Sequence, residues 1–541
     1  MTESGSGTPG WRGSEVAAWI GLAVALGVLV LHAWHFDFIN DDAFISFRYA
    51  DNLVRHGELT FNVGERVEGY TNFLWTMVMA GVLWVGGDPV PWSKGLGVVL
   101  SCGTLGVLFA FGRWWNRSQG GESPVHGAWW SALAPLLLAG NSAFACWSEG
   151  GLETALYTFL LTLGWTRYLF EVTTKARVPW SGVAVALAAM TRPEALMVLG
   201  VMGLHQLGVQ AWVDRRWLPR RETWIWLGGF LVVFLPYLVW RYGYYGYPLP
   251  NTFYAKAGEP LWEAGWRYTS QFVTDFHVWV LVPLVLLPWR RVRHEVSLLA
   301  LAAMIVLPYA VYITRVGGDF MALYRFYVPL LPMLAFVAQE GLANVWGAIA
   351  EAIAARSEGR VPPGARVRAV VLGLALLALV GQQNRTLTGE ALEVGSKDGI
   401  DSIGWLKLFV GQTTAIGVYL RGAWPPETSI ATTAAGVIPY YSQMRTLDLL
   451  ALNDVYTAHN VPAHGKRPGH GKAAPEPYVL QWGPDILIWH PRMSRETPRS
   501  SPTEQQYWRA RGYKFGHAQV PGLDPPHWSF FEKIADAPPA P

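Results

Sequence analysis

Residues 36–50 read FDFINDDAFISFRYA and lie at the exit of the first long apolar run, which extends from about Glu15 to Phe38. An apolar run of this length can span a bilayer whose hydrocarbon core is about 30 Å thick. The carboxylates of Asp41 and Asp42 would then lie at a fixed depth, where water meets lipid. A base at that depth suits an enzyme that joins a water-soluble acceptor to a lipid-borne donor. The alternative is a solvated cap on the next helix, since Asp favours helix starts.

The composition is that of a polytopic membrane protein. Of the 541 residues 51% are hydrophobic and only 15% are charged, and the mean hydropathy is +0.20. The 29 Trp, 22 Tyr and 23 Phe are side chains that favour membrane interfaces. A net charge of +3, with the basic residues in short clusters, argues against a nucleic-acid partner. Cys102 and Cys146 fall in apolar runs and are interpreted as packing residues.

Apolar segments recur throughout the first 383 residues. We expect about eleven spans, near residues 16–36, 92–112, 128–146, 152–170, 180–191, 194–210, 223–241, 279–289, 296–314, 326–346 and 369–383. Segments 180–191 and 279–289 are short enough to be half-helices. The first segment lacks a small-residue cleavage site and is expected to remain as an anchor.

Basic residues cluster in alternate connections, which marks those connections as cytoplasmic. The clusters are Arg113 and Arg117; Lys175 and Arg177; Arg215, Arg216, Arg220 and Arg221; Arg290, Arg291 and Arg293; and Arg356, Arg360, Arg366 and Arg368. They share one side only if residues 72–86 do not cross, so we interpret that stretch as a helix in or at the outer leaflet. The N-terminus is then inside and the C-terminus outside.

Polar and aromatic residues gather in the outward connections. The first, residues 37–91, is too long and too patterned for a mere connector. Further outward stretches are residues 147–153, 242–256 and 315–326. All of them should converge on one membrane face, as a single active site requires. The break at residues 191–194 would place Arg192 and Glu194 at membrane depth, which is costly unless they are paired; a hairpin tip at the outer surface is the interpretation we favour.

Beyond residue 384 the chain gains Pro, Gly and charge. Residues 428–434, 445–450 and 484–489 resemble strands, and a short helix follows Gly436. We therefore divide the chain into a transmembrane catalytic domain, 1–383, and a soluble α/β domain, 384–541. The basic, Gly-rich segment 464–472 is expected to be a flexible loop; the alternative is that it becomes ordered on an anionic or sugar ligand. The four histidines at 459, 464, 470 and 490 match no common metal-site spacing, and we interpret them as surface or glycan-contacting residues.

Several motifs together resemble a known family. They are DDAFISFRY at 41–49, ERVEGYTNFLW at 65–75, Gly151-Leu152-Glu153, PNTFYAK at 250–256, GGDF at 317–320, and AGVIPYY at 435–441 with Leu447-Asp448 after it. In this order they are similar to the terminal arabinofuranosyltransferase family of the mycobacterial cell wall. They are equally similar to its proteobacterial relatives, some of which are labelled flagellar motor control proteins. Within these motifs the candidate substrate-binding residues are Glu68, Tyr70, Asn72, Glu153, Asn251 and Asp319.

The resemblance implies a glycosyltransferase of the GT-C fold, that is, a polytopic α-helical membrane protein, here with a C-terminal extracytoplasmic α/β domain. Such enzymes take a sugar from a polyprenyl-phosphate donor and transfer it to a glycan or lipid-linked acceptor on the outer side of the bacterial inner membrane. The carboxylate after the first span is the expected base, which corresponds to Asp42 or Asp41. The sugar does not follow from the resemblance; a pentofuranose such as arabinofuranose is one candidate.

A lipid phosphate is already a competent leaving group, so the protein must deprotonate the acceptor, align it and stabilise the departing phosphate. An ionised Asp suits the first task. Arg48, Lys256 or Arg325 could supply positive charge for the third. One direct displacement would invert the anomeric carbon. No cofactor is required; a divalent cation between Asp42 and the phosphate is compatible with the sequence, but no spacing demands it.

Two other functions remain open at this point. A lipid or sugar transporter would need ionisable residues at mid-membrane depth and symmetry between its halves, whereas the charges here gather at one face. A non-catalytic membrane protein that supports envelope or flagellar motor assembly would tolerate loss of both Asp41 and Asp42.

Overall fold

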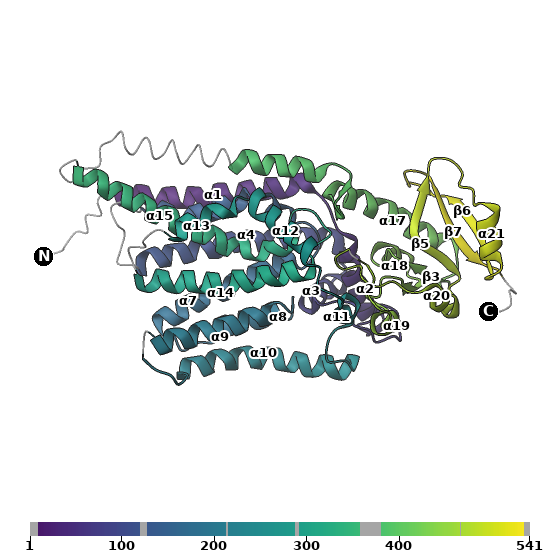
Figure 1. The fold of residues 1–541 in the computed structure, drawn as a ribbon, viewed down its shortest axis with the longest axis horizontal. Coiled ribbons are helices and arrows are strands. Elements are labelled where there is room, and N and C mark those ends of the chain that lie inside the picture. The colour runs from purple at the N-terminus through teal and green to yellow at the C-terminus, as the bar shows by residue number, and fades with distance from the viewer. Residues whose placement is uncertain are drawn as a thin grey trace.

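The computed structural model describes residues 9–118, 127–212, 215–286, 292–356, 380–465 and 467–534. The molecule is elongated, with a helical bundle at one end and a five-stranded sheet at the other (Figure 1). We refer to the end of the bundle nearer the sheet as the sheet end.

The regular elements of the bundle and its connections are helices. In chain order the elements are α1 (Pro9–Phe36), α2 (Asp41–His56), α3 (Phe73–Trp84), α4 (Pro89–Ser118), η1 (Ala128–Ala132), α5 (Leu133–Ala139), α6 (Ser142–Cys146), α7 (Thr154–Thr174), α8 (Trp180–Ala189), α9 (Ala195–Trp212), α10 (Arg221–Tyr245), α11 (Asn251–Lys256), α12 (Trp262–Asp275), η2 (Val278–Val280), α13 (Leu281–Leu286), α14 (Val292–Val316), η3 (Arg325–Leu330) and α15 (Leu331–Arg356), followed by a helix over residues 380–392.

Within the described ranges, six helices are long and apolar enough to cross a membrane, or seven if the bent pair Trp262–Asp275 and Val278–Leu286 is one span. A multi-pass membrane protein is thus confirmed, whereas the count of about eleven is not. The apolar helices 73–84, 128–139 and 180–189 are shorter than the other candidates. Helix α7, at the predicted span 152–170, is not among the six and buries most of its residues. Most of the predicted span 369–383 lies outside the described residues.

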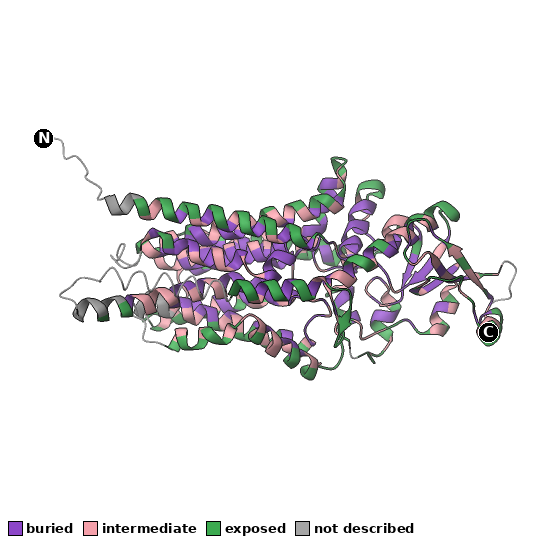
Figure 2. Ribbon diagram, turned by 90° about the horizontal axis from the view of Figure 1, so that it is seen from above, coloured by how far each residue is buried: buried purple, intermediate pink, exposed green. Residues whose placement is uncertain are grey.

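The outer surface of the bundle is apolar. On α10, Val232 is 76% exposed and Val239 is 65% exposed, and exposed residues follow the outside of the bundle along its length (Figure 2). Large apolar surfaces of this kind are rare on water-soluble proteins. The exposed face of α10 is therefore the one that contacts lipid.

Helix α3 stays at the sheet end, in agreement with the expectation that residues 72–86 do not cross. Its 12 residues give a length of about 18 Å, well short of the hydrocarbon core. The Leu74 amide donates to the carbonyl oxygen of Met190, just after α8, over 3.0 Å. This bond ties α3 to the connection between α8 and α9.

The residues after 392 build the sheet and the helices around it. The elements are β1 (Ser396–Lys397), β2 (Ile400–Asp401), α17 (Ile403–Ala423), β3 (Ser429–Thr432), α18 (Val437–Ser442), β4 (Arg445–Asp448), α19 (Val455–Asn460), α20 (Glu476–Trp482), β5 (Ile486–Ser494), α21 (Pro502–Arg509), β6 (Tyr513–Gln519) and β7 (His527–Lys533). The order is β4-β3-β5-β7-β6, with β3 parallel to both neighbours and β7 antiparallel to β5 and β6. Neighbouring residues Ile430 and Ala431 enter different apolar cores, so the sheet is covered on both faces.

Helix α2 and the loop after it contribute one of the interfaces that join the sheet-bearing part to the bundle. Arg48 is buried, and its guanidinium donates to the carbonyl oxygens of Phe61, Pro439 and Met444. The Asn62 side chain and the Thr446 backbone exchange two hydrogen bonds, of 2.9 and 3.0 Å. Residues almost 400 positions apart in sequence therefore form one interface.

The predicted outward connections meet at the sheet end, as expected. The Asn251 amide donates to Glu68 O over 3.0 Å, which joins α11 to the first connection. The Asp401 amide donates to Phe320 O over 2.7 Å, which joins the segment 315–326 to the chain beyond the bundle. In Figure 1 the labels α2, α3, α11 and α18 lie together at this end.

Candidate functional site

The two aspartates open α2. Asn40 is the N-cap residue, and its side chain accepts a hydrogen bond of 2.8 Å from the Asp42 amide. The Asn40 amide donates to Gly150 O over 3.2 Å, which fixes the start of α2 against the connection before α7. Negative charge in a first helical turn is stabilised by the helix dipole. Adjacent helical residues diverge by about 100°, so Asp41 and Asp42 have different surroundings.

Asp41 is engaged with the sheet-bearing part. Its carboxylate accepts from the Val437 amide over 2.8 Å and from the Gly436 amide over 3.2 Å. A Cβ at Gly436 would lie 1.9 Å from the backbone oxygen of Asp41, so this approach requires glycine. Burial raises the pKa of Asp41 to about 7. Asp41 therefore lies in the interface between α2 and the start of α18.

Asp42 is half-buried and differs from its neighbour. Among the described residues, no side chain or amide forms a hydrogen bond or ion pair with its carboxylate. Its charge nevertheless acts on Lys256 and on His470. Asp42 is therefore a carboxylate with free acceptor capacity, and a lysine and a histidine lie within electrostatic range.

Lys256 is the last residue of α11 and keeps solvent access. Desolvation by the surrounding protein lowers its pKa, and the charges of Asp42, Arg325, Arg192 and Asp319 also act on it. Across the described ranges its ammonium group has no hydrogen-bond or ion-pair acceptor. Lys256 is thus a cation without a partner in a crowded, charged environment.

Arg325 and Asp319 form a buried pair beside Lys256. Arg325 Nε donates to Asp319 over 2.7 Å, and the guanidinium lies 5.4 Å from the ring centre of Trp147. In the part of the chain that the structure describes, no residue accepts a hydrogen bond from its two Nη atoms. The preceding turn needs glycine, because Gly318 has φ +78° and a Cβ there would lie 2.4 Å from Tyr268.

Glu153 and Asn72 meet Arg192. The Arg192 guanidinium pairs with Glu153 at 3.0 Å and with Glu194 at 2.8 Å, and Asn72 donates to Glu153 over 2.9 Å. The break at 191–194 is thus a turn whose charges are paired. Sequence reasoning flagged this Arg–Pro–Glu break but did not include Arg192 among the site residues, because the partner Glu153 lies far away in sequence.

The remaining candidates hold the framework together. Glu68 forms a buried ion pair of 2.6 Å with Arg241 of α10, and the Tyr70 hydroxyl lies 3.1 Å from the Tyr245 hydroxyl. Asn251 Nδ2 donates to the carbonyl oxygens of residues 451 and 452 over 3.0 and 2.9 Å. These side chains, like Arg48, use their polar atoms on neighbouring elements.

The structure therefore brings together Asp42, Lys256, Asp319, Arg325 and Arg192, which we call the Asp42 cluster. No group of three or more His, Cys, Asp or Glu side chains within the described residues could hold a metal ion. The cluster can accept a proton through Asp42 and can bind an anion through Lys256 and Arg325.

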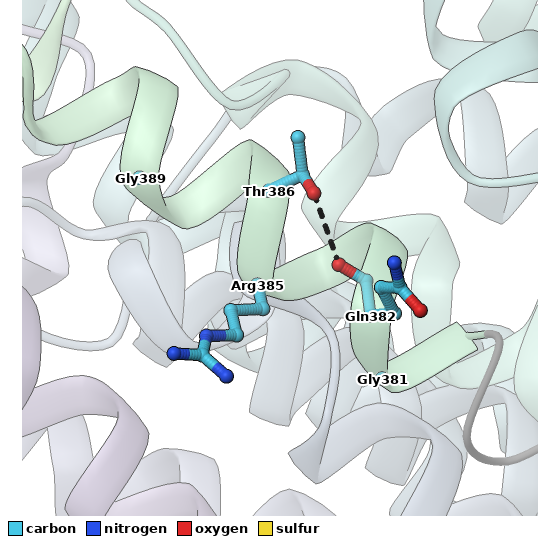
Figure 3. A pocket seen from close by; sticks show the side chains of 5 residues that line it. All are labelled: Gly381, Gln382, Arg385, Thr386 and Gly389. Atoms are coloured by element: carbon cyan, nitrogen blue, oxygen red, sulfur yellow. Dashed lines mark hydrogen bonds between the residues drawn. The ribbon is translucent and has the colours of Figure 1, made fainter.

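A separate hollow of about 670 Å³ lies along the helix over residues 380–392. It is lined by Gly381, Gln382, Arg385, Thr386 and Gly389 (Figure 3). Arg385 is its one charged lining residue, and none of the lining residues carries a carboxylate. The hollow therefore offers no general base and contains no member of the Asp42 cluster.

Comparison of structures defines the class of fold. The protein resembles ArnT from Cupriavidus metallidurans bound to undecaprenyl phosphate, with a TM-score of 0.56 and 13% identity over 96% of this chain and 98% of that one. The apo form of the same enzyme gives a TM-score of 0.54 with 15% identity over the same shares. ArnT is a GT-C glycosyltransferase, and the chain has the GT-C fold.

Comparison of sequences confirms the resemblance to the terminal arabinofuranosyltransferases. The "Terminal beta-(1->2)-arabinofuranosyltransferase" of Mycobacterium tuberculosis is 29% identical over 363 residues, which cover 59% of this chain and 55% of that protein. The protein of the same name from Corynebacterium glutamicum is 26% identical over 369 residues, 58% of this chain and 49% of its own length. The chain thus spans about half the length of these curated relatives. Residues 407–531 match a family model described as a domain of unknown function, DUF8728.

Proposed function

We propose that the protein is a membrane glycosyltransferase that moves a sugar from a polyprenyl-phosphate donor to a glycan or lipid-linked acceptor. The reaction would take place at the sheet end, on the extracytoplasmic side of the bacterial inner membrane. The observation that carries the proposal is a carboxylate, Asp42, that has no partner among the described residues and acts on Lys256, a lysine on which Arg325 also acts, within a GT-C fold. The names of the curated relatives make arabinofuranose the first sugar to test.

Asp42 is the proposed general base. Its acceptor capacity is unused among the described residues, whereas the carboxylate of Asp41 already accepts two backbone hydrogen bonds. In the proposed step the acceptor hydroxyl gives its proton to Asp42 as its oxygen bonds to the anomeric carbon. The bond from that carbon to the phosphate oxygen breaks, and polyprenyl phosphate leaves with the electron pair. A single displacement inverts the anomeric configuration.

Lys256 and Arg325 are the proposed phosphate-binding residues. Bringing Lys256 into a crowded site costs hydration, and a phosphate dianion would offset that cost. Arg325 is oriented by Asp319, which leaves its Nη atoms available for phosphate oxygens. Arg48 was considered for this role from sequence, but it is buried and each of its three guanidinium nitrogens already donates to a carbonyl oxygen, so we assign it to the interface instead.

The candidate substrate-binding residues fall into two groups, those that orient a residue of the Asp42 cluster and those that hold the surrounding elements in place. We propose that Asp319 acts by orienting Arg325, and that Asn72 and Glu153 act by orienting Arg192. Glu68, Tyr70 and Asn251 would instead hold the first connection and α11 in position beside the Asp42 cluster.

The test is transfer by the purified protein in proteoliposomes. A short-chain polyprenyl-phosphate arabinofuranose serves as donor and an octyl arabinofuranosyl disaccharide as acceptor, with the product detected by mass spectrometry. We expect a product one sugar larger together with release of polyprenyl phosphate, and a fall in both by roughly two to four orders of magnitude with the Asp42→Asn variant. Transfer by that variant at a rate close to the wild-type rate would refute the assignment of the base. Reporter fusions after Arg117 and after Asn384 should report opposite compartments; the same compartment for both would refute the proposed side.

A further inference from the structure

Residues 463–465 and 467–471 of the sheet-bearing part lie over the outward connections of the bundle. A Cβ at Gly258, just after α11, would lie 3.1 Å from the Cβ of Ala463. A Cβ at Gly317 would lie 3.3 Å from Pro468 Cγ. The sequence suggested a flexible loop here; the structure gives it defined contacts with the segments that carry Lys256 and Asp319.

The described residues of the segment also hold one another. The amides of His464 and Gly465 both donate to Gly471 O, over 2.9 and 3.0 Å, and the His470 amide donates to Arg467 O over 3.1 Å. Arg467 pairs with Asp401 at 2.5 Å. These backbone hydrogen bonds close the turn, and the pair of Arg467 with Asp401 holds it in place.

Both aromatic contacts of the turn involve Phe320, the residue after Asp319. The Arg467 guanidinium lies 5.0 Å from the centre of the Phe320 ring, and the His470 ring meets the same ring edge-on at 4.7 Å. The turn therefore places His470 beside the segment that orients Arg325, and the charges of Asp42 and Lys256 act on this histidine.

The hydrogen bonding of His470 determines what its free nitrogen can do. His470 Nδ1 lies 3.0 Å from Pro468 O. A carbonyl oxygen only accepts, so Nδ1 carries the proton and donates. Burial lowers the pKa of His470, which favours the neutral ring. Nε2 is then an acceptor, and no described residue donates to it.

We propose that His470 Nε2 accepts a hydrogen bond from a hydroxyl group of the acceptor sugar while Asp42 takes the proton from the reacting hydroxyl. The inference rests on the proposed function. The acceptor is favoured over the donor because His470 comes from the sheet-bearing part, away from the lipid-facing surface, whereas the cations for the donor phosphate come from the bundle. His470 is thus a specificity residue that the motifs of the bundle do not reveal.

The experiment compares His470→Ala, His470→Gln and His464→Ala in the proteoliposome assay, with donor and acceptor varied separately. Gln keeps an acceptor oxygen near the position of Nε2, and His464, exposed in the same turn, is the matched control. One hydrogen bond is worth roughly five- to tenfold in binding. We therefore expect His470→Ala to raise the acceptor KM by roughly that factor and to leave the donor KM unchanged, while His470→Gln and His464→Ala stay within about twofold of the wild type.

An unchanged acceptor KM in His470→Ala would overturn the inference, and so would a change confined to the donor KM. An equal effect of His464→Ala would assign the change to folding of the turn and would also overturn it. The wild type separates this failure from failure of the proposed function. If the wild type transfers sugar and Asp42→Asn does not, only the role of His470 is at issue.

Discussion

Asp42→Asn and Asp41→Asn make the same chemical change at adjacent positions, yet they should have opposite consequences. Asn keeps the size of the side chain but cannot accept a proton as a carboxylate does. At Asp42 we expect turnover to fall by roughly two to four orders of magnitude, the usual contribution of a general base. At about 1.36 kcal/mol for each factor of ten, the barrier rises by about 3–5 kcal/mol.

The cost in stability should follow the reverse order. The Asp42 carboxylate has no partner among the described residues, so Asp42→Asn should lose only its interaction with the helix dipole, which is less than about 1 kcal/mol in the free energy of unfolding. Asp41 accepts from the amides of Gly436 and Val437. An Asn at 41 offers one oxygen, and its NH₂ group would face the second amide. Asp41→Asn should therefore cost about 1–3 kcal/mol.

The assay measures turnover at saturating donor and acceptor together with thermal unfolding of the same detergent-solubilised preparations. Asp42→Asn should unfold like the wild type and be nearly inactive; Asp41→Asn should unfold at a lower temperature and keep most of its turnover while folded. The reasoning is refuted if Asp41→Asn, folded, loses turnover as severely as Asp42→Asn, or if Asp42→Asn retains it.

Three further predictions follow from the same contacts. Lys256→Met should raise the donor KM by roughly tenfold and leave the acceptor KM unchanged, because the charge acts on the phosphate. Lys256→Arg should stay close to the wild type. Equal donor KM values for the two variants would show that Lys256 only anchors α11. Gly436→Ala should destabilise the protein by about 1–3 kcal/mol in thermal unfolding, since its Cβ would lie 1.9 Å from Asp41 O. Gly422→Ala, with nothing within 4 Å of the added Cβ, should not destabilise it. Equal effects of the two variants would mean that the interface rearranges to accept the added methyl group. Because burial raises the pKa of Asp41 from 3.8 to about 7, the folded state binds this proton more tightly than the unfolded chain, so stability should fall as pH rises between these values. Asp448, whose pKa burial raises to about 6, acts in the same direction. A pH dependence of stability as steep in Asp41→Asn as in the wild type would contradict the contribution of Asp41.

Local patterns in the sequence predicted the elements well where the physics is local. The apolar run before Phe38 becomes α1, and the three predicted strands of the C-terminal part become β3, β4 and β5. The number of membrane spans was harder to predict from the sequence. Helix α7 carries Arg167 and Glu171, which form an ion pair of 3.1 Å with each other. Hydropathy alone therefore does not decide whether this helix is a membrane span.

The roles of the site residues were harder to predict, because their partners are backbone atoms far away in sequence. The donors to Asp41 lie at residues 436 and 437, and two acceptors of Arg48 lie at residues 439 and 444. A backbone amide or carbonyl group has no side-chain signature. Sequence could therefore indicate that Asp41, Asp42 and Arg48 lie near a site, but it could not show which of them keeps a free polar group.

The most direct measurement is a structure of the protein bound to a non-cleavable polyprenyl phosphonate that carries the sugar. We predict that the phosphonate oxygens lie within hydrogen-bond distance of Lys256 Nζ and of the Arg325 Nη atoms, with the anomeric carbon facing the Asp42 carboxylate. A phosphonate bound against Arg385 in the hollow of the helix over residues 380–392, with the Asp42 cluster empty, would contradict the proposed site.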